Sequence, residues 1–172
     1  MALALISGGS GLIGTALSRL LLQHGHQVVV LTRDPLKRPS YGESAVWDGI
    51  HPELWMAWVE KADWIINLAG ENIGAQPWKP ERLRQISESR VFAGELLSEA
   101  VLRAPHRPSA FLQMSAIGYY GPQDENDEEA LDEHCPSGQD RLAAICREWE
   151  GSSVKVENLR VRRLIVRTGL VL

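Results

Sequence analysis

The sequence is poor in cysteine, carries little net charge and contains no long apolar run. It has only two cysteines, Cys135 and Cys146, and their spacing is not that of metal ligands. So few cysteines argue against a disulfide scaffold and for a reducing compartment. A net charge of −4 is too small to indicate a nucleic-acid or membrane-surface partner. No stretch approaches the roughly 18 apolar residues of a membrane helix, and the first residues lack the features of a secretory signal. We therefore expect a cytoplasmic protein that binds neither nucleic acid nor membranes.

What the chain does contain is the composition of an ordinary globular protein. Hydrophobic residues make up 44% and charged residues 23%, which excludes the disordered, collagen-like and coiled-coil classes. The length of 172 residues corresponds to one domain, which we place at residues 1–172. Seven of the 22 acidic residues lie between positions 124 and 133, so the acidity of the chain is concentrated in one segment.

A glycine-rich segment separates two different apolar patterns near the N-terminus. Residues 2–7 form a short apolar run that predicts a buried strand. After the glycines, apolar residues recur at helical spacing from Leu12 up to Gly25, and glycine is a common helix terminator. Residues 28–31 are apolar again and predict a second strand. Strand, glycine turn, helix and strand form a βαβ unit, which predicts parallel strands buried on both faces.

The alternation of short apolar runs and helical patterns continues along the chain, without an internal repeat or a low-complexity linker. It predicts an α/β fold with a Rossmann-like, doubly wound parallel sheet. The remaining predicted elements are a strand at 44–47, a short helix at 52–61, a strand at 64–68, a long helix at 81–102, a strand at 110–115, a helix at 139–150 and a strand at 161–166.

The last residues, from Thr168 to Leu172, are apolar and strand-like. Chain termini are usually exposed and polar, so we expect that a longer natural protein continues beyond this point. The alternative is that Leu172 completes an edge strand.

The glycines at positions 8, 11 and 14 have the spacing and the setting of a dinucleotide-binding turn. Gly8 permits a tight turn, Gly11 lets the backbone approach a pyrophosphate, and Gly14 lets helix and strand pack closely. Free N–H groups and the dipole of the following helix would hold the diphosphate. A glycine-rich turn without a ligand is the alternative. The residues predicted to bind the cofactor here are Gly8, Gly9, Ser10, Gly11, Leu12, Ile13 and Gly14.

The residues after the second strand select between the two nicotinamide dinucleotides. An NAD-binding turn places an acidic residue about 20 residues after the glycines, where it binds the ribose hydroxyls. This sequence has Thr32 and Arg33 there, and a guanidinium matches a 2′-phosphate in charge and geometry, so NADP is favoured over NAD. Lys37 and Arg38 could assist from the following loop. Asp34 leaves two alternatives open, since it could pair with Arg33 or bind the ribose itself.

Short segments in a fixed order link the chain to a known family: 7–14 (SGGSGLIG), 47–48 (WD), 67–73 (NLAGENI), 89–91 (SRV), 115–121 (SAIGYYG), 146–150 (CREWE) and 167–172 (RTGLVL). Through them the whole chain resembles the extended short-chain dehydrogenase/reductase superfamily. It is most similar to the epimerase-like branch, the NAD-dependent epimerase/dehydratase family. Members of that family continue beyond the last motif into a substrate-binding region, which agrees with the expected truncation.

The resemblance implies that Asn67, Leu68, Ala69 and Gly70 line the ribose and phosphate side of the cofactor. They follow a strand, and ligands of open α/β sheets bind outside the carboxyl ends of the strands. The alternative is a tight turn, in which Gly70 breaks the strand and Asn67 bonds to the backbone. Asp48, at the end of the third strand, would either reach the adenine amine or cap the segment that follows.

The residues that carry catalysis in this superfamily are only partly present. Its reductases and epimerases use a serine and a Y-x-x-x-K helix, whose lysine lowers the pKa of the tyrosine. None of the three tyrosines here is followed by lysine four residues later, and Leu142 and Cys146 stand at the tyrosine and lysine positions. The candidate catalytic hydroxyls are those of Ser115, Tyr119 and Tyr120. For the two tyrosines, packing over the edge of the sheet is an equal alternative.

Other polar positions are less specific. Arg90 stands on the long helix where relatives have an asparagine and could point into the crevice, although such an arginine is more often solvated or ion-paired. Cys146 and Trp149 are expected in the core. His134 and Cys135 provide too few ligands for a metal site, so no metal is expected.

Two function hypotheses follow. The first is an NADP-dependent epimerase or oxidoreductase that acts on a nucleotide sugar or another small carbonyl compound. The second is a cofactor-binding regulator or scaffold that has lost catalysis, in keeping with the cell-division-related names of some proteins similar to this branch. The missing Y-x-x-x-K pair favours the second hypothesis, and the cofactor motifs suit both. The expected partner is an unidentified small molecule, with a homodimer left open.

Overall fold

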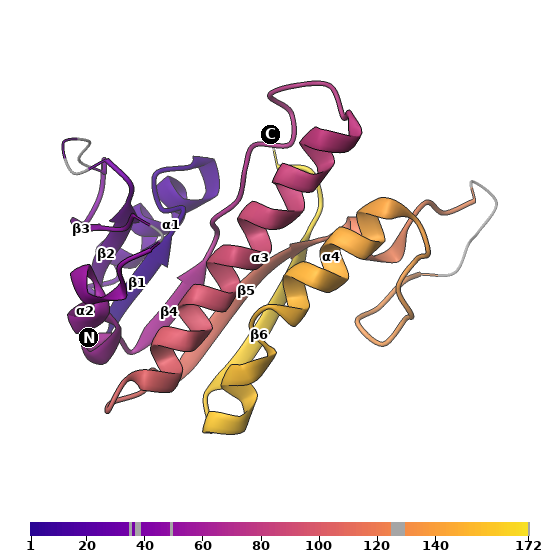
Figure 1. The fold of residues 1–172 in the computed structure, drawn as a ribbon. Helices are drawn as coiled ribbons and strands as arrows, with labels where there is room; N and C mark the ends of the chain where they lie inside the picture. Colours follow the sequence, from indigo (N-terminus) through magenta and orange to yellow (C-terminus); the bar gives the residue numbers. More distant parts are fainter. Residues whose placement is uncertain (35, 37–38, 49, 125–129, 172) are drawn as a thin grey trace.

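The computed structural model describes residues 1–34, 36, 39–48, 50–124 and 130–171, and it shows one parallel sheet flanked by helices (Figure 1). The sheet has six strands in the order β3-β2-β1-β4-β5-β6. The chain moves outward from β1 to β3 and then returns to β4 on the other side of β1, so β1 and β4 border the switch point of the topology. The strands are β1 Leu3–Ser7, β2 Gln27–Thr32, β3 Glu43–Val46, β4 Trp64–Asn67, β5 Ala110–Ala116 and β6 Arg162–Thr168.

Helices cover both faces of the sheet, which confirms the predicted doubly wound α/β fold. On one face, Leu17 and Leu21 of α1 pack against Ile6, Val30 and neighbouring strand residues. On the other face lie α2, α3 and α4, with α3 and α4 side by side across the sheet (Figure 1). The helices are α1 Leu12–Gln23, α2 Met56–Lys61, α3 Pro80–Arg103 and α4 Arg141–Gly151.

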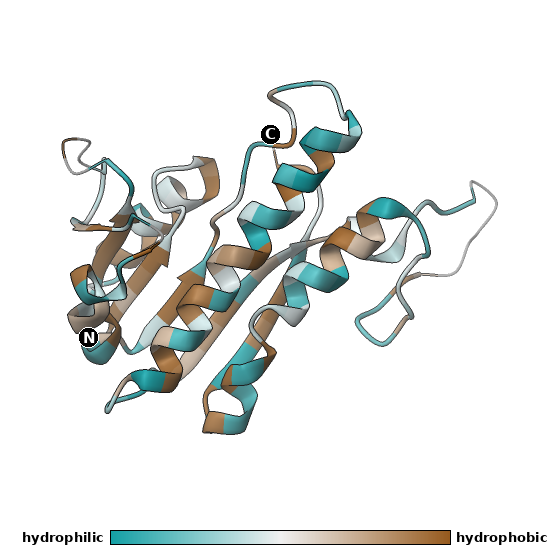
Figure 2. Cartoon of the chain, in the orientation of Figure 1, coloured by the Kyte–Doolittle hydropathy of each residue, from teal (hydrophilic) through white to brown (hydrophobic). Residues whose placement is uncertain are grey.

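Burial follows the alternation that the parallel sheet requires. In β1, Leu5 faces the α3 side and Ile6 the α1 side, and both are fully buried. The strands are largely hydrophobic, whereas α3 and α4 alternate hydrophobic and hydrophilic positions along their length (Figure 2). Among the described residues, none of the helices combines the length and the apolar character that crossing a membrane requires.

The predicted helix at 52–61 is wrong as a single element. It is a 3₁₀ helix at Pro52–Leu54 followed by α2 at Met56–Lys61, with Trp55 between them. The side chain of Trp55 is fully buried and stacks on that of Trp47, with ring centroids 4.9 Å apart. The break therefore accompanies the burial of a large side chain that a continuous helical pattern does not anticipate.

The last strand extends two residues beyond the end predicted for it at position 166 but does not include the strand-like residues after Thr168. Strand β6 ends at Thr168, opposite Ala116 at the end of β5, so the ladder has no further partner there. Residues 169–171 are not in a strand, and Leu172 lies outside the described residues. Two further 3₁₀ helices, Ile117–Tyr120 and Val154–Leu159, were not predicted.

Candidate functional site

Two of the three spaced glycines are required by the packing of the turn between β1 and α1. Gly8 has a φ of 72°, and its carbonyl accepts the N–H of Gly11 at 3.0 Å. A Cβ atom at position 14 would lie 2.5 Å from the Gly8 oxygen, and a Cβ atom at position 9 would lie 2.8 Å from the Val30 side chain. Only glycines allow the strand, the turn and the helix to approach this closely.

Gly11 differs because it borders open space. A Cβ atom there would meet only the Gly8 oxygen, at 3.3 Å. The first N–H groups of α1, those of Leu12, Ile13 and Gly14, have no hydrogen-bond acceptor in the described parts of the chain, and no side chain caps the helix. Unpaired N–H groups at a helix N-terminus favour an anion. The turn therefore fits a pyrophosphate in the place where the sequence predicts one.

The predicted residues beside this turn differ in exposure. Ser10 and Leu12 are exposed, the latter at 67%, while Ile13 is half-buried. The main chain of the turn also lies against the loop after β4, because a Cβ atom at position 8 would be 2.6 Å from the Leu68 oxygen. The glycine turn and residues 67–70 thus form one continuous edge at the switch point.

At the end of β2, Arg33 is exposed and has no hydrogen bond or ion pair with any described residue. The carboxylate of Asp34 instead accepts the N–H of Leu36 at 2.9 Å, and its own N–H donates to the Thr32 hydroxyl. The predicted alternative in which Asp34 pairs with Arg33 is not what the structure shows. The positive charge of Arg33 is left available beside the glycine turn. Lys37 and Arg38 lie outside the described residues.

Asp48 uses its carboxylate locally. One oxygen accepts the N–H groups of Ile50 and His51 at 2.9 and 2.8 Å, and the other pairs with the His51 ring. The His51 and Ile50 N–H groups, together with the His51 ring, lower the pKa of Asp48 to about 2. The predicted N-cap role is wrong, because the N-cap of the 3₁₀ helix Pro52–Leu54 is His51 and no side chain caps that helix. Asp48 instead closes a local turn before the helix. A contact with adenine stays a prediction.

Asn67 links the three neighbouring strands β1, β4 and β5. Its side chain is fully buried. Its Oδ1 accepts the hydroxyl of Ser7 at 2.7 Å and the N–H of Ala69 at 3.3 Å, and its Nδ2 donates to Gln113 at 3.0 Å. The tight-turn alternative describes this side chain correctly. Leu68 and Ala69 are only partly buried and Gly70 is exposed, so a cofactor contact from these three residues stays a prediction.

The end of β5 holds a buried polar network. Ser115 is 1% exposed, and its hydroxyl donates to Glu150 of α4 at 2.6 Å. Arg167 of β6 donates to both carboxylate oxygens of Glu150, at 2.8 and 3.0 Å. This bonding to Glu150 is the main reason that the pKa of Arg167 is raised. Glu150 and Arg167 were not predicted as site residues, although both lie in the family motifs at 146–150 and 167–172.

The two adjacent tyrosines join this network. The guanidinium of Arg167 lies 3.5 Å from the ring centroid of Tyr119, and the two tyrosine rings meet edge to face at 5.3 Å. The Tyr120 hydroxyl accepts from Arg167 at 3.0 Å and donates to the Asp132 carbonyl at 2.9 Å. The Tyr119 hydroxyl has no hydrogen bond within the described ranges. Catalytic roles for Ser115, Tyr119 and Tyr120 stay predictions.

Helix α4 presents no acid or base at the positions where the superfamily has its tyrosine and lysine. Leu142 is partly exposed in the first turn, and Cys146 is buried, as predicted, together with Trp149. Burial raises the pKa of the Cys146 thiol, which keeps it neutral. In the part of the chain that the structure describes, no three His, Cys, Asp or Glu side chains are placed to hold a metal ion.

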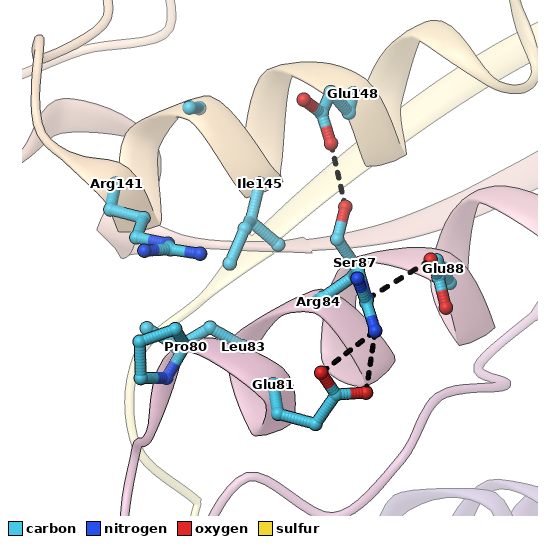
Figure 3. A pocket seen from close by; sticks show the side chains of 10 residues that line it. Pro80, Glu81, Leu83, Arg84, Ser87, Glu88, Arg141, Ile145 and Glu148 are labelled. Atoms are coloured by element: carbon cyan, nitrogen blue, oxygen red, sulfur yellow. Dashed lines mark hydrogen bonds and ion pairs between the residues drawn. The ribbon is translucent and has the colours of Figure 1, made fainter.

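A separate pocket of about 580 Å³ lies between α3 and α4, with the sheet behind the two helices (Figure 3). Several of its charged side chains are already paired: Arg84 with Glu81, and Glu148 with the Ser87 hydroxyl, at 2.7 and 2.6 Å. None of the predicted cofactor or catalytic residues lines it. The pocket is therefore distinct from the edge formed by the glycine turn and residues 67–70.

Comparison with known proteins identifies similar chains. The model of the NAD dependent epimerase/dehydratase family matches residues 4–141. An epimerase family protein of Mycobacterium leprae is 32% identical over 99% of this chain and 53% of its own length. The chain spans about half the length of the curated relatives it matches.

Two solved structures share the fold at 30% identity. The human epimerase family protein SDR39U1, solved with NADPH, has a TM-score of 0.81 over 99% of this chain and 54% of that one. A nucleoside-diphosphate sugar epimerase from Corynebacterium glutamicum has a TM-score of 0.81 over 99% of this chain and 34% of that one.

Proposed function

The chain belongs to the NAD dependent epimerase/dehydratase family, and on that basis we propose that it binds NADP(H) along its glycine turn. The whole protein would use this cofactor as an epimerase or oxidoreductase on a nucleotide sugar or another small carbonyl compound. The observation that carries the proposal is the turn at Gly11, where a Cβ atom would meet only the Gly8 oxygen and the first N–H groups of α1 have no acceptor among the described residues. The presence of NADPH in the human relative supports it.

The preference for NADP over NAD rests on Arg33. It is a cation without a partner among the described residues, at the end of β2, where an NAD-binding turn would have an acid. A guanidinium binds a phosphate through paired, charge-assisted hydrogen bonds. One such contact is worth about 1.5–3 kcal/mol, so NADPH should bind at least about tenfold more tightly than NADH.

Calorimetric titration of the unmodified protein with NADPH and with NADH tests this proposal. Arg33→Ala should weaken NADPH binding and leave NADH binding nearly unchanged. Arg19→Ala, which removes an exposed arginine from α1, is the matched control and should change neither affinity. Equal affinities of the unmodified protein for the two cofactors would contradict the preference, and the absence of binding would contradict the cofactor site.

When bound, the nicotinamide ring would exchange hydride with the substrate. The chain would have to supply the accompanying proton from the segment 115–120. Of the three candidate hydroxyls, those of Ser115 and Tyr120 already donate to Glu150 and Asp132. The Tyr119 hydroxyl has no such partner in the described structure, and we assign proton transfer to it.

The proton-transfer assignment is tested by measuring turnover of the Ser115→Ala, Tyr119→Phe and Tyr120→Phe variants of the full-length protein. Loss of a general acid typically lowers the rate about 10²–10⁴-fold. We expect the largest loss for Tyr119→Phe, with NADPH affinity unchanged. Normal turnover of all three variants would rule the segment out as the proton donor.

A cofactor-binding regulator without catalysis is the second candidate. It is favoured by Leu142 and Cys146, which place no proton donor or cation at the usual catalytic positions of α4. A hydride-exchange assay with bound NADPH and a panel of carbonyl compounds separates the two functions. Tight NADPH binding without any hydride transfer would favour the regulator.

A further inference from the structure

Arg90 of α3 is held in a fixed orientation at the carboxyl end of β4. Its Nη1 donates to the carbonyl oxygens of Glu71 and Ile86, at 3.1 Å each. The guanidinium carbon lies 4.8 Å from the ring centroid of Trp149 in α4. It also lies against Gly70, where a Cβ atom would be only 2.9 Å away. Contacts with two helices and the loop after β4 thus position this side chain.

The charge of Arg90 is not neutralised by a carboxylate of the described residues. Its neighbour Arg82 is the contrasting case, because it ion-pairs with Glu71 at 3.2 Å and donates to the Asn72 carbonyl at 2.6 Å. Both guanidinium groups therefore donate hydrogen bonds to main-chain carbonyls of the same loop, and Glu71 forms an ion pair with only one of them, that of Arg82. Within the described part of the chain, the partly buried cation of Arg90 thus forms no ion pair, and Glu71 acts on it only from a distance.

The remaining donors of Arg90 are free and reachable. Its Nε and Nη2 atoms form no hydrogen bond with any described residue, and they are not among the buried polar atoms sealed from solvent. Burial lowers the pKa of Arg90, but an arginine remains protonated at neutral pH. A desolvated cation with unused donors is costly unless a ligand or water satisfies it.

The position of Arg90 relates it to one half of the dinucleotide. In a doubly wound sheet the pyrophosphate lies at the switch point and the two nucleotides extend to opposite sides. Arg33 lies on the β2 side, where the adenine nucleotide is expected. Arg90 lies on the β4 side, behind Gly70, where the nicotinamide nucleotide would pass.

We propose that Arg90 binds the nicotinamide nucleotide of NADP(H), with Nε and Nη2 donating hydrogen bonds to its ribose oxygens. This inference rests on the proposed cofactor function and extends it to a second arginine. Arg33 and Arg90 then hold the two ends of one ligand, and Arg82 keeps the intervening loop in shape.

Calorimetry with two ligands tests the inference. NADPH contains both nucleotides, whereas adenosine 2′,5′-bisphosphate lacks the nicotinamide nucleotide. Arg90→Met should weaken NADPH binding at least tenfold and leave adenosine 2′,5′-bisphosphate binding within twofold. Arg33→Ala should weaken the binding of both ligands. Arg84→Met, on the solvent side of the same helix, is the control and should change neither.

The possible outcomes separate the two proposals. If the unmodified protein binds both ligands and Arg90→Met binds NADPH equally well, the role of Arg90 is overturned while the cofactor site stands. If Arg90→Met weakens both ligands equally, Arg90 acts through the loop and the ribose contact is overturned. If the unmodified protein binds neither ligand, the proposed function and this inference both fail. Should Arg90→Met fail to fold, Arg90→Lys decides: a loss confined to NADPH supports the contact, and unchanged affinity overturns it.

Discussion

The two ends of the candidate site differ in whether their polar groups have hydrogen-bond partners. At the glycine turn and the end of β2, the first N–H groups of α1 and the guanidinium of Arg33 have no partner among the described residues. At the end of β5, Ser115, Glu150 and Arg167 satisfy one another in a nearly closed network. Open donors indicate a ligand, whereas paired buried groups indicate a structural role. The first region, the glycine turn with Arg33, is suited to binding a ligand, and we call it the open end of the site. The second, formed by Ser115, Glu150 and Arg167, holds β5, β6 and α4 together, and we call it the paired end.

The largest expected effect is on stability at the paired end. Arg167→Met would leave the 9%-exposed Glu150 without its cation. Removal of one partner of a buried ion pair costs about 3–5 kcal/mol. Arg84→Met breaks a pair whose two side chains are each 62% exposed, and such pairs are worth at most about 1 kcal/mol.

Urea unfolding of the two variants measures this difference. A loss for Arg167→Met no larger than that for Arg84→Met would show that the Glu150 network does not stabilise the fold, and the contrast between the two ends of the site would disappear.

The next effect is on binding at the open end. Gly11 has an ordinary φ of −77°, and a Cβ atom there would meet only the Gly8 oxygen, at 3.3 Å, so Gly11→Val should fold after a shift of a few tenths of an ångström in the turn. Its side chain would occupy the place of the pyrophosphate, and NADPH affinity should fall at least about 100-fold, or about 2.7 kcal/mol. Gly151→Val, at a glycine far from the turn whose Cβ position has no atom within 4 Å, is the control. Normal NADPH binding by Gly11→Val would place the phosphate site elsewhere.

Much of the open end could be predicted from the sequence because its signals are local. The glycine spacing, the change from strand to helical periodicity and the position of Arg33 all lie within the first 33 residues. Gly8 and Gly14 have the physical reasons predicted for them, namely the turn and the close packing, and the approach of a pyrophosphate at Gly11 stays a prediction. Such local constraints can be predicted from the sequence without knowledge of contacts between distant residues.

The paired end could not be predicted because its partners are distant in sequence. Ser115 and Glu150 are 35 residues apart, and Glu150 and Arg167 are 17 apart. Ser115 was predicted from its place at a strand end, but the strand end does not reveal that α4 turns a carboxylate toward it. The sequence could place Arg90 near the crevice but could not show whether its charge is paired, because that depends on whether Glu71 pairs with Arg82.

A smaller effect compares two serine–glutamate bonds of equal length. The Ser115 hydroxyl donates to Glu150 and the Ser87 hydroxyl to Glu148, each at 2.6 Å, but only the first bond is buried. Ser115→Ala should lower the free energy of unfolding by about 1.5–3 kcal/mol without altering NADPH affinity. Ser87→Ala should have little effect, because water replaces the lost partner. Equal stability losses would show that burial does not distinguish the two bonds.

The smallest effect concerns Asp48, which lies at the open end but is paired locally. Its bond raises the pKa of His51 above the ordinary value of 6.5. Because the pKa of the carboxyl is lowered and that of the imidazole is raised, the pair should contribute to stability between about pH 4 and the raised pKa of His51. Its contribution is lost as acid protonates Asp48 toward pH 2, and again as base deprotonates His51.

Proton NMR titration of the His51 ring, assigned with His51→Gln, measures this pairing directly. Asp48→Asn should return the pKa of His51 toward 6.5. Since the carboxylate already accepts two N–H groups and the ring, saturating NADPH should leave the His51 pKa unchanged. A fall in that pKa when NADPH binds would mean that Asp48 leaves His51 for the adenine amine. Asp48 would then pair with His51 only in the absence of the cofactor, and the cofactor-binding residues would include one that follows β3.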